Sequence, residues 1–372
     1  MNEQELKSFG AVVTGVMTGR HLSREEARRI FAEILFGDQP DLQKGAFLAA
    51  LRMKGETADE IAGCFEAIYA LDTNKVEMPG DVLIENCGTG MDTLKTFNVS
   101  TLASIVAASL GVKLARHGAR AITSRCGTVD LCEALGVDVE CNVETVRRSI
   151  EVCGIGLFNG MSAQVHPSGL GRILSQIRFG TTLNIAASLA NPALPRMAVR
   201  GVGAVDQIGP TLDVMEKIGY RKAILCHGWD EQRQKGMDEL STLGHSTLGV
   251  LEEGGNRRFL EITPEEAGLR RGRYDDLRPR DTVQEEAVEA VRLLAGRGNP
   301  SRTDIVALNA GAILWLSGSA DSLRAGTEQT LHQILLGRPI EKLRQWVITQ
   351  NRSAGSGLAT LSAVAAKAGL LL

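Results

Sequence analysis

The stretch DVLIENCGTGMDTLKTFNVSTLASIVAASLG, residues 81–111, is the one on which the fold assignment depends. It contains a short apolar run, then a glycine-rich turn, and then an apolar segment with helical spacing. A glycine-rich connection between a strand and a helix exposes backbone N–H groups, and the helix N-terminus favours an anion above it. The stretch therefore predicts a strand, a loop suited to a phosphate group, and a helix.

Short apolar runs alternate with helical segments over the following residues. Four further strands are predicted at residues 112–118, 154–159, 197–202 and 222–228, and a hairpin is predicted around Gly254 and Gly255. Such alternation is typical of an α/β domain with a mainly parallel sheet. The fold class that we predict is therefore α/β, and the last 90 or so residues return to a helical pattern.

The region before this alternation has the pattern of a small helical domain. Ser23 is followed three residues later by Glu26, which is the spacing of a capping box at the start of a helix. A Pro-Gly pair marks the join to the α/β region. We expect a helical domain over residues 1–78, with a returning segment near 165–190, and an α/β domain over 79–372.

The composition describes a folded chain without a strong charge bias. The chain has 372 residues, of which 44% are hydrophobic, and a formal net charge of −3. This balance argues against nucleic-acid binding through a general basic surface. The seven scattered cysteines form no CxxC pair, which disfavours a disulfide framework or a zinc site. Since there is no secretory pattern and no apolar run of ~18–20 residues, we expect a cytoplasmic protein without a membrane segment.

The glycine-rich turn supplies the first set of candidate ligands. The same glycines would also suit a tight turn without a ligand, but the dense hydroxyl and amide groups that follow favour a phosphate-containing ligand. The motif is neither a P-loop nor a dinucleotide-binding GxGxxG. The candidate donor-binding residues of this turn are Gly88, Thr89, Gly90, Asp92, Thr96, Asn98, Ser100 and Thr101.

Two further motifs add charged candidates. In LARHGARAITSRCGTVD, residues 114–130, Arg116 and His117 stand with two more arginines near a predicted strand end, a pattern suited to phosphates or to a plain surface cluster. Farther along, Asp238 and Glu239 are adjacent. Because Mg²⁺ is usually held by one or two carboxylates plus substrate phosphates, this pair is a candidate metal site, although acidic pairs are also common on surfaces. An arginine-rich run over 270–280 reads as a solvated loop.

Together these motifs resemble the anthranilate phosphoribosyltransferase family. The family's GTGGD–TxNxST loop matches the glycine turn in register, its KHGNR is approximated by residues 116–120, and its SGSAD by residues 126–130. Its NLLGPLTNPA corresponds to NIAASLANPA, residues 184–193, and its acidic pair to Asp238 and Glu239. The resemblance covers almost the whole chain.

The resemblance implies a nucleoside phosphorylase/phosphoribosyltransferase-like fold, phosphoribosyl pyrophosphate as donor, an aromatic acceptor, and a homodimer formed through the helical domain. It also implies Mg²⁺ held by Ser100, Asp238 and Glu239, with Cys126 at the donor site. Arg116 and His117 would be catalytic, and Arg116 would also bind the donor.

Departures from the family pattern gather on the acceptor side. Met91, Thr93 and Lys95 replace loop glycines. The acceptor pocket that the resemblance implies contains His117, but Ala119, Leu174 and Ser188 differ from the family residues, and Leu174 stands where the family has the arginine that holds the anthranilate carboxylate. An unpaired buried carboxylate is costly, so we favour a neutral aromatic amine over anthranilate as acceptor.

Two other classes of function remain open at this level. A nucleoside phosphorylase would use orthophosphate, and the retained acidic pair disfavours it. A non-catalytic paralogue that binds nucleic acid or a protein would be expected to lose the glycine loop and the acids, which this chain keeps.

Overall fold

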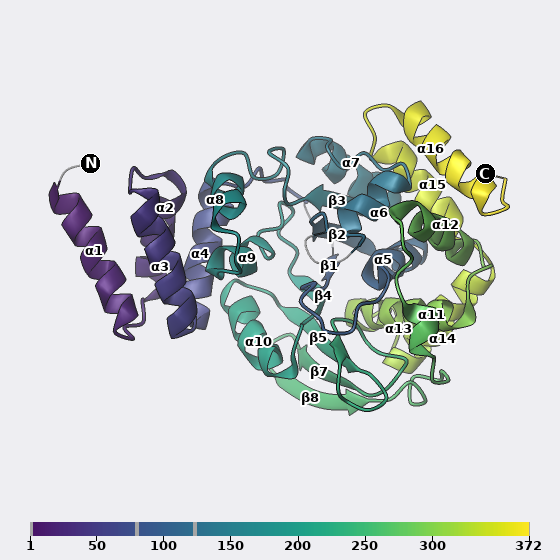
Figure 1. Ribbon diagram of the computed structural model, residues 1–372. Helices are drawn as coiled ribbons and strands as arrows, with labels where there is room; N and C mark the ends of the chain where they lie inside the picture. Colours follow the sequence, from purple (N-terminus) through teal and green to yellow (C-terminus); the bar gives the residue numbers. More distant parts are fainter. Residues whose placement is uncertain (1–2, 79–81, 122–124, 372) are drawn as a thin grey trace.

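The structure is a computed structural model that describes residues 3–78, 82–121 and 125–371. It has a small group of helices at the N-terminal end and a larger part built on a twisted sheet with helices on both faces (Figure 1). The predicted fold class, an N-terminal helical domain with a larger α/β domain, is confirmed. Among the described residues, none of the helices combines the length and the apolar character that a bilayer crossing requires.

Four helices form the N-terminal group. They are α1 (Glu3–Met17), α2 (Arg24–Phe36), α3 (Asp41–Lys54) and α4 (Ala58–Leu71). The predicted capping box is present at α2, where the Ser23 side chain accepts from the Glu26 amide, and Thr57 caps α4 in the same way. Buried aromatic rings such as Phe31 and Phe47 pack edge to face between these helices. The caps therefore fix where the helices start, and apolar packing holds the helices together.

Two later helices return to this group. They are α8 (Gly169–Ile177) and α9 (Thr182–Ala187), which pack against α2 and α4 and lie beside them in Figure 1. Their buried residues belong to the same apolar cluster as the N-terminal helices. The expected domain join at residues 78 and 79 stays a prediction, because residues 79–81, with the Pro-Gly pair, lie outside the described residues.

In the part of the chain that the structure describes, a single eight-stranded sheet organises the larger part. Its strands are β1 (Leu83–Cys87), β2 (Lys113–Gly118), β3 (Ile155–Asn159), β4 (Met197–Gly201), β5 (Lys222–Trp229), β6 (Gly236–Met237), β7 (Ser246–Leu251) and β8 (Arg257–Ile262). The order is β3-β2-β1-β4-β5-β7-β8, with β6 paired to β5. The first five are parallel, and β7 and β8 are antiparallel, as the predicted hairpin requires. All the predicted strands are therefore confirmed, and β1 lies inside the sheet between β2 and β4.

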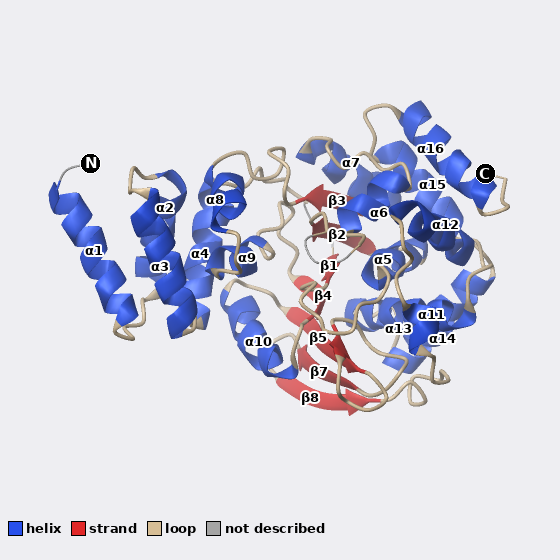
Figure 2. Cartoon of the chain, in the orientation of Figure 1, coloured by secondary structure: helices blue, strands red, loops and turns tan. Residues whose placement is uncertain are grey.

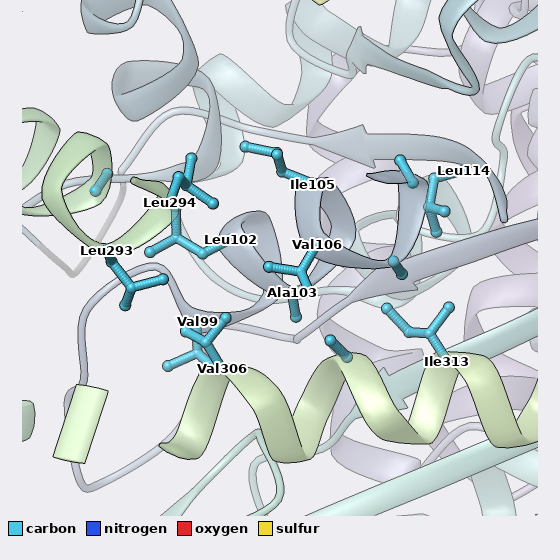
Figure 3. Packing of buried hydrophobic residues seen from close by; sticks show 14 of the residues in the cluster. Val99, Leu102, Ala103, Ile105, Val106, Leu114, Leu293, Leu294, Val306 and Ile313 are labelled. Atoms are coloured by element: carbon cyan, nitrogen blue, oxygen red, sulfur yellow. The ribbon is translucent and has the colours of Figure 1, made fainter. Parts of the chain in front are cut away.

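Helices cover both faces of this sheet (Figure 2). The remaining elements are α5 (Val99–Ser109), α6 (Thr128–Ala134), α7 (Val143–Cys153), η1 (Val205–Gln207), α10 (Ile208–Lys217), α11 (Tyr274–Leu277), α12 (Val283–Leu294), α13 (Pro300–Ser317), α14 (Leu323–Leu335), α15 (Pro339–Thr349) and α16 (Ala354–Lys367). On one face, Val99, Leu102 and Val106 of α5 lie near Val306 and Ile313 of α13 within the main core (Figure 3). The arginine-rich run is not wholly a loop, because it contains the short helix α11.

Alternate side chains of the central strands enter different cores. Val199 of β4 belongs to the cluster around α5 and α13, whereas its neighbour Ala198 belongs to the cluster around the N-terminal helices. Because successive strand residues point to opposite faces, the sheet separates the two cores and is buried on both sides. The carboxyl ends of its parallel strands are thereby held in fixed positions, and the loops that follow them form the candidate site.

Candidate functional site

The loop after β1 meets the segment after β6. The backbone N–H of Gly90 donates to Asp238 Oδ2 at 2.6 Å, and the Thr89 hydroxyl lies 3.4 Å from the same oxygen. The Thr96 hydroxyl donates to Glu239 Oε2 at 3.3 Å. The glycine turn and the acidic pair, 148 residues apart in sequence for Gly90 and Asp238, thus form one site.

Close packing explains the first glycine of the turn. A Cβ added at Gly88 would lie 2.4 Å from Asp238 Oδ2, closer than atoms approach without a shift. Gly90 has a φ of +67°, which favours glycine. The turn therefore needs glycine here for its approach to the carboxylate. The structure also directs the Gly90 amide at Asp238, whereas the sequence led us to expect the turn amides to face a phosphate.

Burial raises the proton affinity of the acidic pair. The pKa of Asp238 is raised to about 6, first by loss of solvent and then by the nearby Asp92. The pKa of Glu239 is raised well above its ordinary range, again first by burial and then by Asp238. Because burial makes both carboxylates harder to ionise, a hard divalent cation bound between their oxygens would stabilise the charged forms.

The protein itself supplies few ligands for a divalent cation at Asp238 and Glu239. Within the described ranges, no group of three or more His, Cys, Asp or Glu side chains is arranged to hold a metal. Asp238 and Glu239 are nevertheless buried, at 7% and 9% exposure, and adjacent. They fit the usual mode for Mg²⁺, in which one or two carboxylates act together with substrate phosphates.

Thr93 and Lys95, two residues that replace loop glycines, form hydrogen bonds that hold the loop in place. The Thr93 and Leu94 amides donate to the carbonyl of Gly236 at 3.0 and 2.8 Å, and the Thr93 hydroxyl accepts from the Gly236 amide at 3.0 Å. Lys95 Nζ donates to the Gly90 carbonyl at 2.9 Å and to Asp92 Oδ1 at 2.7 Å. The sequence identified these residues as added bulk and charge, but it gave no sign of their contact partners.

Arg116 lies beneath the start of α5. Its side chain is 2% exposed, Nη2 donates to the Ser100 hydroxyl at 3.1 Å, and Nε donates to the Asn86 carbonyl at 3.3 Å. Nη1 is buried without a hydrogen-bond partner. A buried cationic group with an unmet donor is suited to an incoming anion. Ser100, a predicted metal ligand, therefore contacts this guanidinium.

His117 follows Arg116 on β2 and is also buried. Its pKa is lowered to about 3, first by burial, then by His166 and by Arg200, while the backbone of Ser188 acts in the opposite direction. The His117 and His166 rings meet edge to face at 5.6 Å, and His117 Nε2 has no hydrogen-bond partner. The imidazole is therefore neutral at physiological pH.

The other two arginines of this segment do not join the site. Arg120 forms ion pairs with Asp130 and Glu133, and Arg125 pairs with Asp281. Both arginine side chains are more than 40% exposed. The idea of several cations gathered at one loop was wrong for them, because they lie beyond the end of β2, where surface carboxylates are available.

The remaining donor candidates connect the glycine loop to the segment 126–130. Asn98 Nδ2 donates to the Cys126 carbonyl at 3.1 Å, and the hydroxyls of Thr101 and Thr128 lie 2.7 Å apart. Cys126 itself is buried. These contacts place the two family-like segments side by side, and the roles of their residues in binding a ligand stay predictions.

The acceptor candidates are less tightly grouped. Ala119 is half-buried just beyond β2, and Ser188 ends α9 close to His117. Leu174 is half-buried on α8 and packs against the apolar cluster of the N-terminal helices. Arg172, two residues before Leu174, pairs with Asp41 at 3.3 Å. Arg178, at the end of α8, is exposed.

A buried charged group beside these residues was missed by sequence reasoning. Arg200 of β4 is 3% exposed, bonds to the Ser188 side chain, and donates to Cys87 Sγ at 3.2 Å. Glu85 of β1 lies 3.8 Å from it and accepts from Tyr220 at 3.0 Å. The sequence did contain a signal for this pair, because Arg200 and Glu85 each interrupt an apolar run that was predicted to be a strand.

Two surface hollows lie outside this group of residues. One, of about 640 Å³, runs along α12, and the other, of about 410 Å³, lies between residues 230–232 and 271–275. Neither is lined by the glycine turn or the acidic pair. The second borders Tyr274, whose hydroxyl donates to the Lys95 carbonyl at 3.1 Å, so the arginine-rich segment supports the glycine loop from behind.

Comparisons with known proteins agree across the chain. Residues 80–339 match the family described as glycosyl transferase family, a/b domain, and residues 12–71 match its helical bundle domain. The chain is 35% identical over 356 residues to anthranilate phosphoribosyltransferase of Methanothermobacter marburgensis, covering 92% of this chain and 99% of the relative.

Solved structures share the fold. The anthranilate phosphoribosyltransferase of Thermus thermophilus superposes with a TM-score of 0.81 at 31% identity, over 91% of this chain and 98% of that one. The yeast protein in complex with PRPP and Mg has a TM-score of 0.79 at 23% identity, over 94% and 98%, and shows likeness of fold.

Proposed function

Because the chain belongs to the anthranilate phosphoribosyltransferase family, we propose that it transfers a 5-phosphoribosyl group from phosphoribosyl pyrophosphate to an aromatic amine. The observation that carries the proposal is the 2.6 Å hydrogen bond from the Gly90 amide to Asp238, which unites a phosphate-type loop with an acidic pair. In the reaction the bond from the anomeric carbon to pyrophosphate breaks, a bond to the amine nitrogen forms, and the amine releases a proton.

We assign the donor to the glycine loop and the segment beside it. The hydroxyls of this loop and the amides at the N-terminus of α5 would surround the phosphates, while the Gly90 amide stays on Asp238. Arg116 has an unpartnered Nη1 beneath this helix, which suits it to a negatively charged oxygen of the donor. Its guanidinium would thus stabilise charge that grows on the leaving pyrophosphate.

Asp238 and Glu239 are assigned to a magnesium ion, with Ser100 as a further ligand. When bound, this ion supplies electrostatic stabilisation of the leaving diphosphate. The donor set fits, because both carboxylates are buried and oxygen-based. Gly88 leaves the space that brings the turn against Asp238.

His117 is assigned to the acceptor side. It is neutral, and its unpartnered Nε2 is free to hydrogen-bond an amine. An aromatic amine is already a nucleophile, so holding it in line with the anomeric carbon contributes more than a strong base would. This role is one of positioning the reacting nitrogen.

For the acceptor, we favour a neutral aromatic or heteroaromatic amine over anthranilate. The support is local: Leu174 takes the position of the family's carboxylate-binding arginine and packs among apolar side chains, and Arg172, two residues earlier, is paired with Asp41. The named relatives carry the anthranilate activity in their names, so anthranilate is the reference compound in the test.

Pyrophosphate release from phosphoribosyl pyrophosphate and Mg²⁺ tests the proposal, with anthranilate and a series of uncharged aromatic amines as acceptors. We expect release with at least one amine, and a loss on the order of 100-fold or more in the double variant Asp238→Ala/Glu239→Ala. The matched control is Glu252→Ala/Glu253→Ala, which removes an adjacent acidic pair near the β7–β8 turn.

Each part of the proposal has its own contrary result. If no amine supports pyrophosphate release, the transferase assignment is wrong. If the double variant Asp238→Ala/Glu239→Ala keeps full activity, the metal assignment is wrong. If anthranilate is the best acceptor, or if the chain rescues a tryptophan auxotroph that lacks its own enzyme, the preference for a neutral acceptor is wrong.

We further propose that the protein is a homodimer formed through the N-terminal helices. The support is a set of exposed apolar side chains on that group: Met17, Phe36, Leu42 and Met53.

A further inference from the structure

Lys95 places a cation inside the acidic side of the glycine loop. Its Nζ lies 2.7 Å from Asp92 Oδ1 and 2.9 Å from the carbonyl oxygen of Gly90. The Asp92 side chain is only 7% exposed and that of Lys95 is 33% exposed. This ion pair is therefore much less screened than the surface pairs elsewhere in the protein.

One peptide group links this lysine to the acidic pair. The carbonyl of Gly90 accepts from Lys95, while the N–H of the same residue donates to Asp238 at 2.6 Å. Thr96, which follows Lys95 in the chain, donates its hydroxyl to Glu239 Oε2 at 3.3 Å, so the same loop contacts both acids of the pair. Three carboxylates and one ammonium group therefore interact within a single site.

We infer that Lys95 is a built-in counterion of Asp92, Asp238 and Glu239 that competes with the divalent cation and keeps its affinity low until the donor diphosphate is present. The inference rests on the proposed function, because the cation concerned is the one assigned to Asp238 and Glu239. Lys95 would thus be a residue that controls metal binding, beyond the residues assigned to the donor.

Coulomb's law gives the reason for this competition. A cation that enters beside Asp238 is repelled by the lysine charge, and the repulsion is strong where solvent is excluded. A diphosphate brings additional negative charge, which offsets the repulsion. Metal and donor therefore favour each other's binding, and the coupling is reciprocal.

The test measures Mn²⁺ binding to the protein without donor, using the electron paramagnetic resonance signal of the free ion. We expect Lys95→Ala to bind Mn²⁺ about tenfold more tightly than the wild type at low ionic strength, because one unit of opposing charge is removed. Lys95→Arg keeps the charge and should stay within about threefold of the wild type. The difference should shrink in high salt.

Lys217→Ala is the matched control, since it removes a lysine from the ion pair with Asp59 on the surface. It should leave Mn²⁺ affinity unchanged. Equal affinity of Lys95→Ala and the wild type, or no binding by either, overturns the inference. A wild type that releases no pyrophosphate would contradict the proposed function instead, because Mn²⁺ affinity is read without turnover.

Discussion

Burial separates residues that look alike in the sequence. Arg116, Arg120 and Arg125 lie within one short segment, yet only Arg116 is buried and has an unmet donor, while the other two make exposed ion pairs. His117 gains its character in the same way, since loss of solvent holds its imidazole neutral. At this scale the chemistry of a side chain depends on where the neighbouring strands place it.

His117 should make the protein sensitive to acid. Its pKa falls from 6.5 to about 3 on folding, so between these values the unfolded chain binds the extra proton and stability decreases as pH falls. At pH 5 the loss is about 2 kcal/mol relative to neutral pH. Urea unfolding at several pH values should show that His117→Gln reduces this dependence, whatever its effect at pH 7.5, and the lowered pKa of the buried His166 accounts for a part that stays.

The exposed His332 on α14 provides the comparison. His332→Gln should leave the pH dependence of unfolding as it is in the wild type. If His117→Gln loses stability with acid as steeply as the wild type does, the neutral buried imidazole is the wrong description.

At the scale of elements, Asp72 joins the end of α4 to the start of α8. Its two carboxylate oxygens accept from the amides of Ser168 and Leu170, each at 2.7 Å, and the residue is fully buried. Helices begin with amide groups that lack partners, so a carboxylate at this position stabilises α8. The contact ties the returning segment to the N-terminal helices.

Replacement of Asp72 by Asn should weaken this junction. One amide loses its acceptor and the charge near the helix start is lost, which costs about 3 kcal/mol in the free energy of unfolding. Chemical denaturation measures the effect. The comparison is Asp41→Asn, which removes an exposed ion pair between Asp41 of α3 and Arg172 of α8. This change should alter the free energy of unfolding by less than about 1 kcal/mol. Equal effects of the two changes would contradict the role of Asp72.

At the scale of the whole molecule, the N-terminal helices carry a large exposed apolar surface. Leu42 and Met53 of α3 are 88% and 86% exposed, and their spacing places them on one face of the helix. A dimer formed there would bury that face. We expect light scattering to give about twice the chain mass of 39.8 kDa, and Leu42→Asp/Met53→Asp to give the monomer mass.

Val152→Asp tests whether any added charge has this effect, since Val152 of α7 is 66% exposed on the other part of the molecule. That variant should keep the dimer mass. A wild type that is monomeric at all concentrations measured would rule out the proposed assembly.

The sequence by itself determined the local elements. The capping residues Ser23 and Glu26 act within one helical turn, the positive φ of Gly90 belongs to one tight loop, and the spacing of apolar residues identifies the strands. These are interactions between near neighbours in the chain, so their pattern is readable residue by residue. The similarity of the loop, the acidic pair and the segment 126–130 to one family then predicted the fold.

Only the tertiary structure decided which distant groups meet. It brought Asp238 to the Gly90 amide and Glu239 to the Thr96 hydroxyl, and it set Arg200 beside Ser188 and Glu85. Such contacts, and the loss of solvent that shifts the pKa of His117, depend on how the sheet and its two cores exclude water. That exclusion is the sum of packing over many residues far apart in the sequence, and no short stretch encodes it.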